Sequence, residues 1–487
     1  MATEEEIQMG MGGECVIGEM NHNSSWVAVD VEKMLAEDDP DSRRKEAEGW
    51  AARYIYRAPE WLKGTNSKAY QPQLVSLGPF HHGDPNLLPM EEHKCRALVH
   101  LINRSQKPLQ DFISAIQGVA EELKAAYGKD LNDEWRDDSR PFVEMMLRDG
   151  CFLLEMMSGP LGDYQLHDPV FSKSGRKRIY SIILSDMLQI ENQLPLLVLK
   201  KILGVVLLRR RREDEMDFDI ALMVTECLGR AHEDGDIVVL EGLQEDAMDK
   251  ITNLMVLRFL CREKQGRDIA NMSLRHHPLE LYHGSLTYKE DAHEDRKALH
   301  EYKYEMMPPA LEIHEAGIKF RKSERDSLLD IHFDLKRGVL TMPVMTVVDS
   351  TESLYLNLMA FERLHAGAGD LVTAYVICMD NMIVSAKDVA MLSSKGLLEN
   401  MLGCDEEMAK LFNGTLSRGQ LLSPCYGLYK VQCNVKAYCK EPWHKWRATL
   451  LRTYFRNPWA FLSLAAAVIL LIATMLQTVY TVLPNKS

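Results

Sequence analysis

The sequence predicts a mainly α-helical protein with a small antiparallel β element and one C-terminal transmembrane helix. Three observations predict this class: long stretches with apolar residues at helical spacing, one short stretch of alternating apolar and polar residues, and a final apolar run without charge. The chain has 487 residues, of which 46% are hydrophobic, so it can bury a large core. We therefore expect one globular domain over residues 49–440 ahead of the membrane segment.

The N-terminal residues differ in composition from this domain. Residues 1–48 carry 13 acidic and 4 basic side chains, which predicts a flexible acidic arm with a short helix at 26–35. Residues 54–94 contain several proline and glycine turns around an extended segment at 74–77. A helix is then expected from Pro89 to Ile102.

Helical patterns dominate the next part of the chain. They cover residues 108–127, 140–157, 179–208, 216–229 and 244–264. The stretch 140–157 is apolar on nearly every face, which predicts a central position in the core. The most polar regions, 208–248 and 265–303, are expected to hold long loops, and the histidines of the second region are expected at the surface: His276, His277, His283, His293 and His300.

The period changes after residue 308. A short helix opened by Pro308-Pro309 is expected to end at Gly317. Residues 318–347 then alternate around a turn at Arg337-Gly338, which predicts the small antiparallel sheet. Residues 353–366 return to helix, and residues 371–384 fit either strand or helix. Residues 398–415 resemble two short helices with Asp405 as a cap, and residues 425–446 predict a last amphipathic helix.

Several polar residues interrupt the apolar patterns of 140–157 and 179–208. Buried carboxylates are costly unless they are paired or hydrogen-bonded, so partners such as Arg57, Lys94, Arg96 or Arg148 are expected. A proline inside a helix also removes an amide hydrogen and exposes a carbonyl four residues back. We interpret the set as a structural polar network, and keep a ligand-binding role and acid-base catalysis as alternatives; its members are Asp149, Glu155, Asp186, Glu191, Asn192, Gln193 and Pro195.

No pattern typical of a reaction, a cofactor or a metal occurs. The sequence lacks a Gly-x-Ser-x-Gly elbow, a phosphate loop, a dinucleotide fingerprint and a His-Glu-x-x-His motif, and its ten cysteines form no Cys-x-x-Cys pair. The net charge of −14 argues against a nucleic-acid partner. We therefore expect no enzyme activity, no cofactor and no metal.

The membrane segment is predicted from Trp459 to Leu483. Its 25 positions would form a helix of roughly 37 Å, and a bilayer's hydrocarbon core is about 30 Å thick. A buried core helix is the alternative, but such helices keep a polar stripe. The basic and aromatic residues of 441–458 suit a juxtamembrane segment, and only a short tail, 484–487, follows the helix. Bases concentrate before the span, which predicts a cytosolic domain on a single-pass C-terminal anchor: Lys436, Lys440, Lys445, Arg447, Arg452 and Arg456 precede it and Lys486 follows it.

Several motifs in order resemble the plant family known as domain of unknown function 247. They include YQPQLVSLGPFHHG at 70–83, RDGCFLLEM at 148–156, SDMLQIENQLP at 185–195, ALEIHEAGIKF at 310–320 and LNLMAFERL at 356–364. Residues 274–282 depart from the family pattern. The resemblance implies a plasma-membrane-associated plant protein without an assigned enzymatic activity, and some grass relatives are implicated as pollen-side determinants of self-incompatibility.

Together these observations predict a membrane-anchored, non-catalytic interaction or recognition protein. Its expected partners are the lipid bilayer and one or more unidentified proteins. Two alternatives remain open: a self-incompatibility determinant, by analogy with the family, and an unrecognised enzyme that uses the buried carboxylates.

Overall fold

A computed structural model describes residues 40–64, 66–158, 164–207, 245–261, 273–287, 306–324, 327–328, 330–416, 426–454 and 458–482. The chain divides into two units, residues 1–52 and 53–487. In the first unit, Pro40–Ala52 forms helix α2, which buries no residue. The predicted arm, 1–48, is therefore helical over its last residues, and the helix predicted at 26–35 lies outside the described residues.

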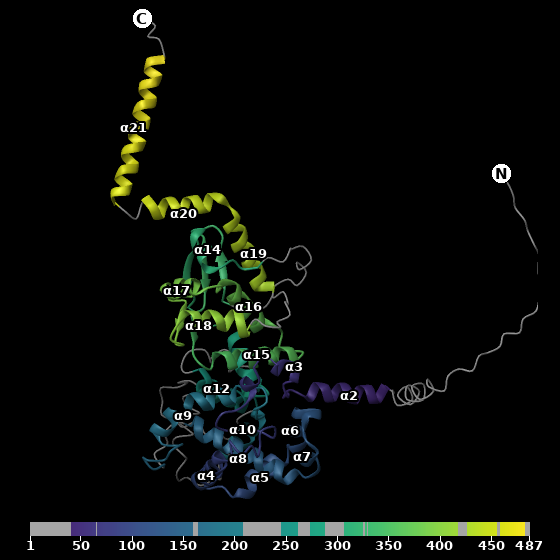
Figure 1. The fold of residues 1–487 in the computed structure, drawn as a ribbon. Coiled ribbons are helices and arrows are strands. Elements are labelled where there is room, and N and C mark those ends of the chain that lie inside the picture. Colours follow the sequence, from purple (N-terminus) through teal and green to yellow (C-terminus); the bar gives the residue numbers. More distant parts are fainter. Residues whose placement is uncertain are drawn as a thin grey trace, which may run out of the picture. The chain divides into compact units, whose positions relative to one another are not determined.

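The first half of the second unit is built around helix α8 (Ser139–Met157). This helix buries residues on all sides, including Phe142 and Phe152, and lies against α4, α5 and α10 (Figure 1). Its central position confirms the prediction for 140–157. The other elements here are α3 (Glu60–Lys63), η1 (Ser67–Tyr70), α4 (Pro89–Ser105), α5 (Leu109–Gln117), α6 (Ala120–Tyr127), η2 (Gly128–Asp130), α7 (Asp133–Asp137), α9 (Lys173–Met187) and α10 (Leu196–Leu207).

The prediction of one helix over 179–208, with Pro195 inside it, is wrong. Helix α9 ends at Met187, α10 begins at Leu196, and residues 188–195 between them are not helical. Pro195 therefore precedes the first turn of α10, where its missing amide hydrogen costs nothing. The expected bare carbonyl of Glu191 does not arise from a kink, because Glu191 is not in a helix.

The second half of this unit is also mainly helical. Helix α12 (Glu245–Cys261) lies against α8 and α10 of the first half. Helix α13 (Pro278–Thr287) contacts α12 and also α15 (Thr351–Leu364) and α16 (Leu371–Met382), so it connects the two halves. The remaining helices are α14 (Ala310–Glu315), α17 (Ala386–Ser394), α18 (Asp405–Lys410), the π-helix η5 (Leu411–Leu416), α19 (Tyr426–Lys440), α20 (Pro442–Tyr454) and α21 (Pro458–Val482). The helix predicted at 216–229 lies outside the described residues.

Two small sheets complete the fold. Strands β2 (His332–Asp334) and β3 (Val339–Met342) form the predicted antiparallel pair, with Phe333 opposite Leu340. The pair turns where expected, because Gly338 has a φ of 61°, which glycine adopts readily. Strand β1 (Lys319–Lys322) joins β3 in parallel, and β4 (Met345–Val347) pairs in parallel with β5 (Leu398–Asn400).

Three local predictions are corrected by these elements. Residues 398–400 form a strand where a helix was expected, because they complete the sheet with β4. Cys404, not Asp405, stands at the cap position of α18. Pro442 divides the predicted amphipathic helix 425–446 into α19 and α20, since proline is favoured at the start of a helix and not inside one.

The predicted fold class is confirmed. Helices form most of the described residues, strands are few, and one apolar helix follows at the C-terminal end. The buried apolar side chains form one continuous core that includes residues from α4 to α19.

Candidate functional site

The polar residues of α8, α9 and 188–195 surround the extended segment 73–78. Asp186, at the end of α9, accepts hydrogen bonds from three successive backbone amides of this segment: those of Gln73 at 2.8 Å, Leu74 at 2.8 Å and Val75 at 2.9 Å. One carboxylate thus satisfies three amides that no strand partner reaches. Segment 73–78 is held by side chains in place of a neighbouring strand.

Asn192 continues this arrangement along the same segment. Its Oδ1 accepts from the amide of Leu77 at 2.7 Å, and its Nδ2 donates to the carbonyl of Val75 at 3.0 Å and of Asp186 at 2.9 Å. The side-chain amide therefore supplies both a donor and an acceptor, as a neighbouring strand would.

Asp149 on α8 fixes the end of the segment. Its Oδ2 accepts from the amide of Gly78 at 2.8 Å, and its Oδ1 lies 2.7 Å from Nζ of Lys94 on α4. Lys94 also donates to Oγ of Ser76 at 3.0 Å and lies 2.6 Å from Glu91. Gly78 is required here: its φ is 73°, and a Cβ would stand 2.7 Å from the carbonyl oxygen of Gln193.

Glu191 and Gln193 tie neighbouring parts of the chain to the same region. Glu191 accepts from the amide of Ala58 at 2.7 Å and pairs with Lys63 at 2.9 Å. Gln193 donates to the carbonyl of Met187 at 2.8 Å and accepts from the amide of Leu279, the second residue of α13, at 3.0 Å.

Glu155 lies in a separate cluster. It pairs with Arg104 of α4 at 2.6 Å and accepts from the hydroxyl of Tyr164 at 3.0 Å. Burial opposes its charge, but hydrogen bonds from His100 and Tyr164 together with the charge of Arg104 hold its pKa below the ordinary value. The seven predicted residues are therefore not one network, since Glu155 makes none of the contacts around segment 73–78.

Of the four expected cationic partners, one contacts a predicted carboxylate. Lys94 pairs with Asp149, whereas Arg96 pairs with Asp168, Arg148 with Glu144, and the Arg57 guanidinium lies over the ring of Phe80. The sequence shows which carboxylates need a partner, but tertiary contacts determine which base is within reach.

The local environment keeps these carboxylates from water. Asp149, Asp186 and Glu191 are at most 4% exposed. Burial raises the pKa of Asp149, against the effect of Lys94 and the Gly78 amide, and raises the pKa of Asp186 to about 6, against the effect of its three amide donors. Their oxygens contact backbone amides and the ammonium groups of Lys94 and Lys63, so the arrangement can hold the chain in place and leaves none of these three carboxylates free for a substrate.

A second buried polar cluster was not predicted. His277 and His283, expected at the surface, are 1% and 5% exposed, while His293 and His300 lie outside the described residues. His283 Nε2 lies 2.9 Å from Glu362 of α15, and Glu362 accepts from the amides of Val372 and Thr373 at the start of α16. The polar composition of residues 265–303 predicted loops, so the sequence did not indicate α13, the helix that carries His283.

His277 has an equally specific place. Its Nδ1 lies 3.0 Å from Oε1 of Gln193, and burial lowers its pKa to about 4. His276 contacts Glu280 at 2.9 Å, and burial of Glu280 is outweighed by the hydrogen bond from His276, so the pKa of Glu280 falls to about 2. The one available sequence signal is the spacing of His276 and Glu280, four residues apart across the start of a helix.

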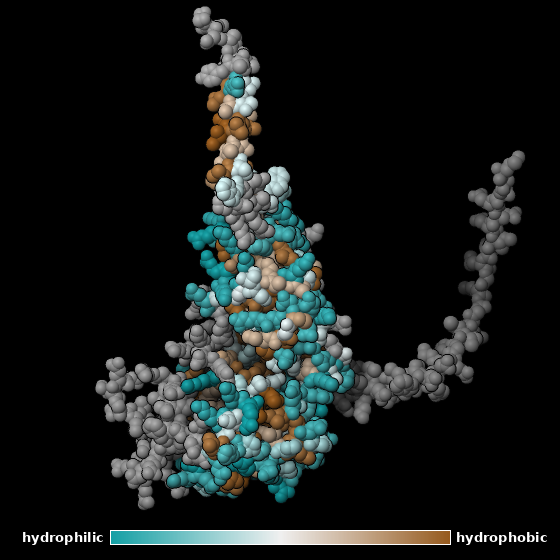
Figure 2. All heavy atoms as spheres, turned by 60° about the vertical axis from the view of Figure 1, so that its left-hand side comes forward, coloured by the Kyte–Doolittle hydropathy of each residue, from teal (hydrophilic) through white to brown (hydrophobic). Residues whose placement is uncertain are grey.

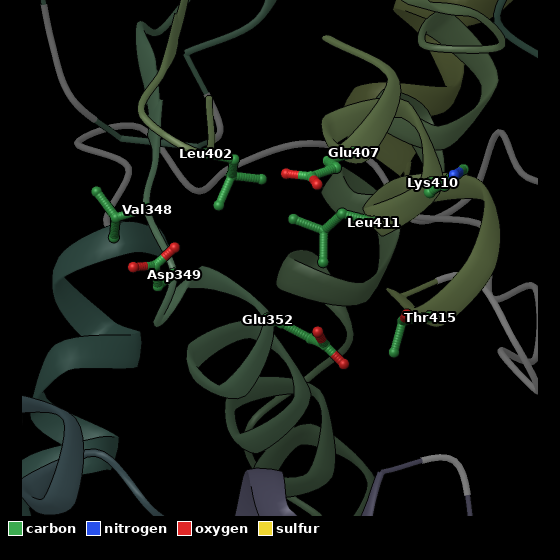
Figure 3. Close-up of a pocket in the computed structure, with 8 residues that line it drawn as sticks. All are labelled: Val348, Asp349, Glu352, Leu402, Glu407, Lys410, Leu411 and Thr415. Atoms are coloured by element: carbon green, nitrogen blue, oxygen red, sulfur yellow. The ribbon is translucent and has the colours of Figure 1, made fainter. Parts of the chain in front are cut away.

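A surface pocket of about 310 Å³ lies beside α15, α18 and η5 (Figure 3). Leu402 and Leu411 point toward its middle, and the carboxylates of Asp349, Glu352 and Glu407 surround them. Glu352 also accepts from Asn66 Nδ2 at 2.7 Å. Lys410 also lines the pocket, so three carboxylates and one ammonium group leave it a net negative charge. An apolar centre with this rim suits a side chain that has an apolar stem and a positive end.

No metal site emerges from this geometry. Among the described residues, no group of three or more His, Cys, Asp or Glu side chains could hold a metal ion.

Helix α21 is the most exposed apolar element of the described chain. The stretch Phe461–Val479 is long and apolar enough to cross a membrane, and none of it is buried. Figure 2 shows its apolar side chains uncovered along the helix. Trp459 lies in its first turn and is 80% exposed, whereas Leu483 lies outside the described residues.

Comparison with known proteins gives the relatives of the chain. The DUF247 family, described as plant protein of unknown function, matches residues 55–473. The UPF0481 protein At3g47200 of Arabidopsis thaliana is 27% identical over 442 residues, which cover 88% of this chain and 86% of the relative. The putative UPF0481 protein At3g02645 of Arabidopsis thaliana is 23% identical over 481 residues, covering 87% and 89%. No solved structure matches the chain.

Proposed function

The chain belongs to the DUF247 family of plant proteins of unknown function, and from this premise we propose that it is a non-catalytic recognition protein held on a membrane by α21. The observation that carries the proposal is the uncovered apolar stretch Phe461–Val479. Leaving so much apolar surface in water is unfavourable by about 25 cal/mol for each Å², and a bilayer removes that cost.

The charge distribution supports a cytosolic domain. The bases before α21 outnumber the single lysine after it, as the positive-inside rule requires for a cytosolic N-terminal side. The resemblance to the family favours the plasma membrane. On a membrane the domain meets other membrane proteins at a raised effective concentration, which suits recognition.

Two features of the domain support binding over catalysis. Asp149, Asp186 and Glu191 already serve the backbone and nearby bases, so a chemical role would require them to leave those contacts. The pocket beside α15 is open to the surface and acidic. We infer that it receives a lysine or arginine side chain of a partner protein.

Proximity labelling from the intact anchored protein tests the recognition site. The variant D349N/E352Q/E407Q keeps the shape of the pocket and removes its three negative charges, which leaves Lys410 as the one charged residue of its lining. The control E121Q/E134Q removes two exposed carboxylates of α6 and α7. We expect the pocket variant to lose a subset of the labelled proteins that wild type and control both label. Identical labelling by all three chains would show that the pocket is not the contact.

The enzyme alternative has a separate test. If D149N and E191Q variants stay folded and membrane-bound but lose a small-molecule turnover that wild type shows, the non-catalytic proposal is wrong.

A further inference from the structure

Helix α20 has one face packed against the domain. His444 stacks on Tyr438 of α19 with ring centroids 3.7 Å apart, and Ala448 lies against Gly317, just after α14. Lys445 lies 3.6 Å from Glu312 of α14. His444 and Ala448 are four residues apart and share a face, since a helix turns by about 100° per residue.

The opposite face of α20 is apolar and exposed. Trp443, Trp446 and Leu450 are 66%, 71% and 45% exposed. At about 100° per residue, these three positions fall within roughly 60° of one another and about 150° from the packed face. A soluble domain would normally bury two neighbouring tryptophans, so the exposure of this stripe calls for a partner.

The short link from α20 to α21 and the charges around the stripe indicate what covers it. Helix α20 ends at Tyr454 and the apolar helix α21 begins at Pro458, so the two Cα atoms are at most about 15 Å apart. The end of α20 therefore cannot leave the surface of any membrane that α21 enters. In addition, no acidic residue occurs between Pro442 and Leu483, whereas basic residues accompany the stripe.

We propose that α20 lies in the membrane interface, with Trp443, Trp446 and Leu450 among the lipid headgroups and Arg447 beside anionic phosphates. Tryptophan favours this layer because its ring is apolar and its N–H is polar. Amphipathic helices with bases at the edge of an aromatic face bind such surfaces. The inference rests on the proposed function, because α21 brings α20 to the bilayer.

One consequence concerns the orientation of the domain. The face of α20 that carries His444 and Ala448 is packed on α14 and α19. Embedding the apolar stripe would therefore fix which side of the domain faces the membrane. Flexible linkage between anchor and domain would leave that side free.

Tryptophan quenching by lipids tests the proposal in the full-length chain. The protein is placed in vesicles of phosphatidylcholine and phosphatidylserine that contain brominated acyl chains, in a W459F background that removes the tryptophan of α21. We expect strong quenching, most of which disappears in W443F/W446F. The matched control W61F removes a tryptophan that is 63% exposed on α3, and should leave the quenching unchanged.

Resistance of the protein to an alkaline carbonate wash, measured in the same vesicles, reports the anchor separately. If the protein resists the wash but W443F/W446F does not change the quenching, the interfacial position of α20 is wrong and the anchor stands. If the wash removes the protein but the quenching is lost in W443F/W446F, α20 binds lipid and the anchor is wrong. If the wash removes the protein and no quenching occurs, both proposals fail. Crosslinking through position 446 between copies, without lipid quenching, would assign the stripe to a second copy of the chain.

Discussion

Lys94 shows, at the scale of single residues, why the buried charges of this protein are structural. It is fully buried and stands among Asp149, Glu91 and Ser76. A buried pair adds little net stability, but removing one partner leaves the other charge uncompensated. The two partners should therefore respond differently to substitution.

The first prediction compares these two substitutions. K94M leaves Asp149 and Glu91 without their cation and should lower the free energy of unfolding by about 3–5 kcal/mol. D149N should cost less, because Lys94 keeps Glu91. Urea unfolding of the full chain in detergent micelles measures both, with K68M on an exposed lysine as the control. Equal losses, or a greater loss for D149N, would contradict this account of the pair.

The second prediction concerns pH and His277. Its pKa is about 4 in the folded protein against 6.5 ordinarily, so below pH 6.5 the unfolded chain binds a proton that the folded chain refuses. Stability contributed by neutral His277 is therefore complete above pH 6.5 and falls as the pH drops toward 4, by up to about 1.4 kcal/mol per pH unit. The folded pKa of Asp186, about 6 against 3.8, acts with the opposite sign between those two values.

Substitution separates the two effects. In H277Q the loss of stability between pH 6.5 and 4.5 should become shallower than in wild type. Part of the loss should stay, because burial also lowers the pKa values of His81, His93 and His365, while Asp186 opposes it below pH 6. The pKa of Glu280 is about 2 in the folded protein against 4.5 ordinarily, so the stability that this group contributes is lost only as the pH falls below 4.5. H332Q, on an exposed histidine of β2, is the control, and unfolding midpoints across this range are the measurement. A loss in H277Q as steep as in wild type would contradict the buried neutral histidine.

Residue-scale features were only partly predictable. The interruption of apolar helices by Asp149, Asp186 and Glu191 marks residues that need partners, and it can be read locally. The partner of His283 is Glu362, 79 positions later, and no local pattern connects the two. The polar sequence neighbours of His277 predict a surface position, but in the fold it is 1% exposed, with Gln193 as its hydrogen-bond partner and the ring of Phe361 beside it.

At the scale of elements, close approach explains which glycines the helices require. In α9, a Cβ on Gly175 would stand 2.5 Å from the carbonyl oxygen of Pro169, which is backbone and cannot turn away. In α10, a Cβ on Gly204 would meet nothing within 4 Å. Both glycines have the same cost in helix propensity.

The third prediction follows from this contrast. G204A should stabilise the protein by about 0.5–1 kcal/mol, because alanine is the better helix former. G175A should destabilise it by about 1–3 kcal/mol or more, because the backbone must shift. Thermal unfolding in micelles measures the two changes, each serving as the control for the other. A stabilising G175A would show that the approach of Pro169 is not close.

Element boundaries followed the chemistry of proline more than the hydrophobic period. The apolar pattern continues across 188–195 and across Glu441, which made single helices the natural prediction. Pro195 and Pro442 instead precede or begin the next helix. Strand β5 could not be predicted from its own residues, because its partner β4 lies about fifty positions earlier.

At the scale of the whole molecule, the proposed topology predicts whether glycans are added at the Asn-x-Ser/Thr sequons, which include Asn103-Arg104-Ser105 and Asn413-Gly414-Thr415. A cytosolic domain leaves Asn103 and Asn413 without glycans, although Asn103 is exposed on α4. We expect endoglycosidase to leave the mobility of the chain on gels unchanged. A long tail with an Asn-x-Thr sequon, added after Ser487, should become glycosylated and serves as the positive control. Glycans on Asn103 and none on the tail would place the domain outside the cell.

Membrane residence of α21 is the claim on which the recognition proposal and the position of α20 depend. Alkaline carbonate extraction of membranes tests it most directly, by comparing the full-length protein with a chain that ends at Asn457. We predict that the full-length protein stays with the membranes and that the shortened chain is released to a much greater extent. Complete release of the full-length protein would contradict the account.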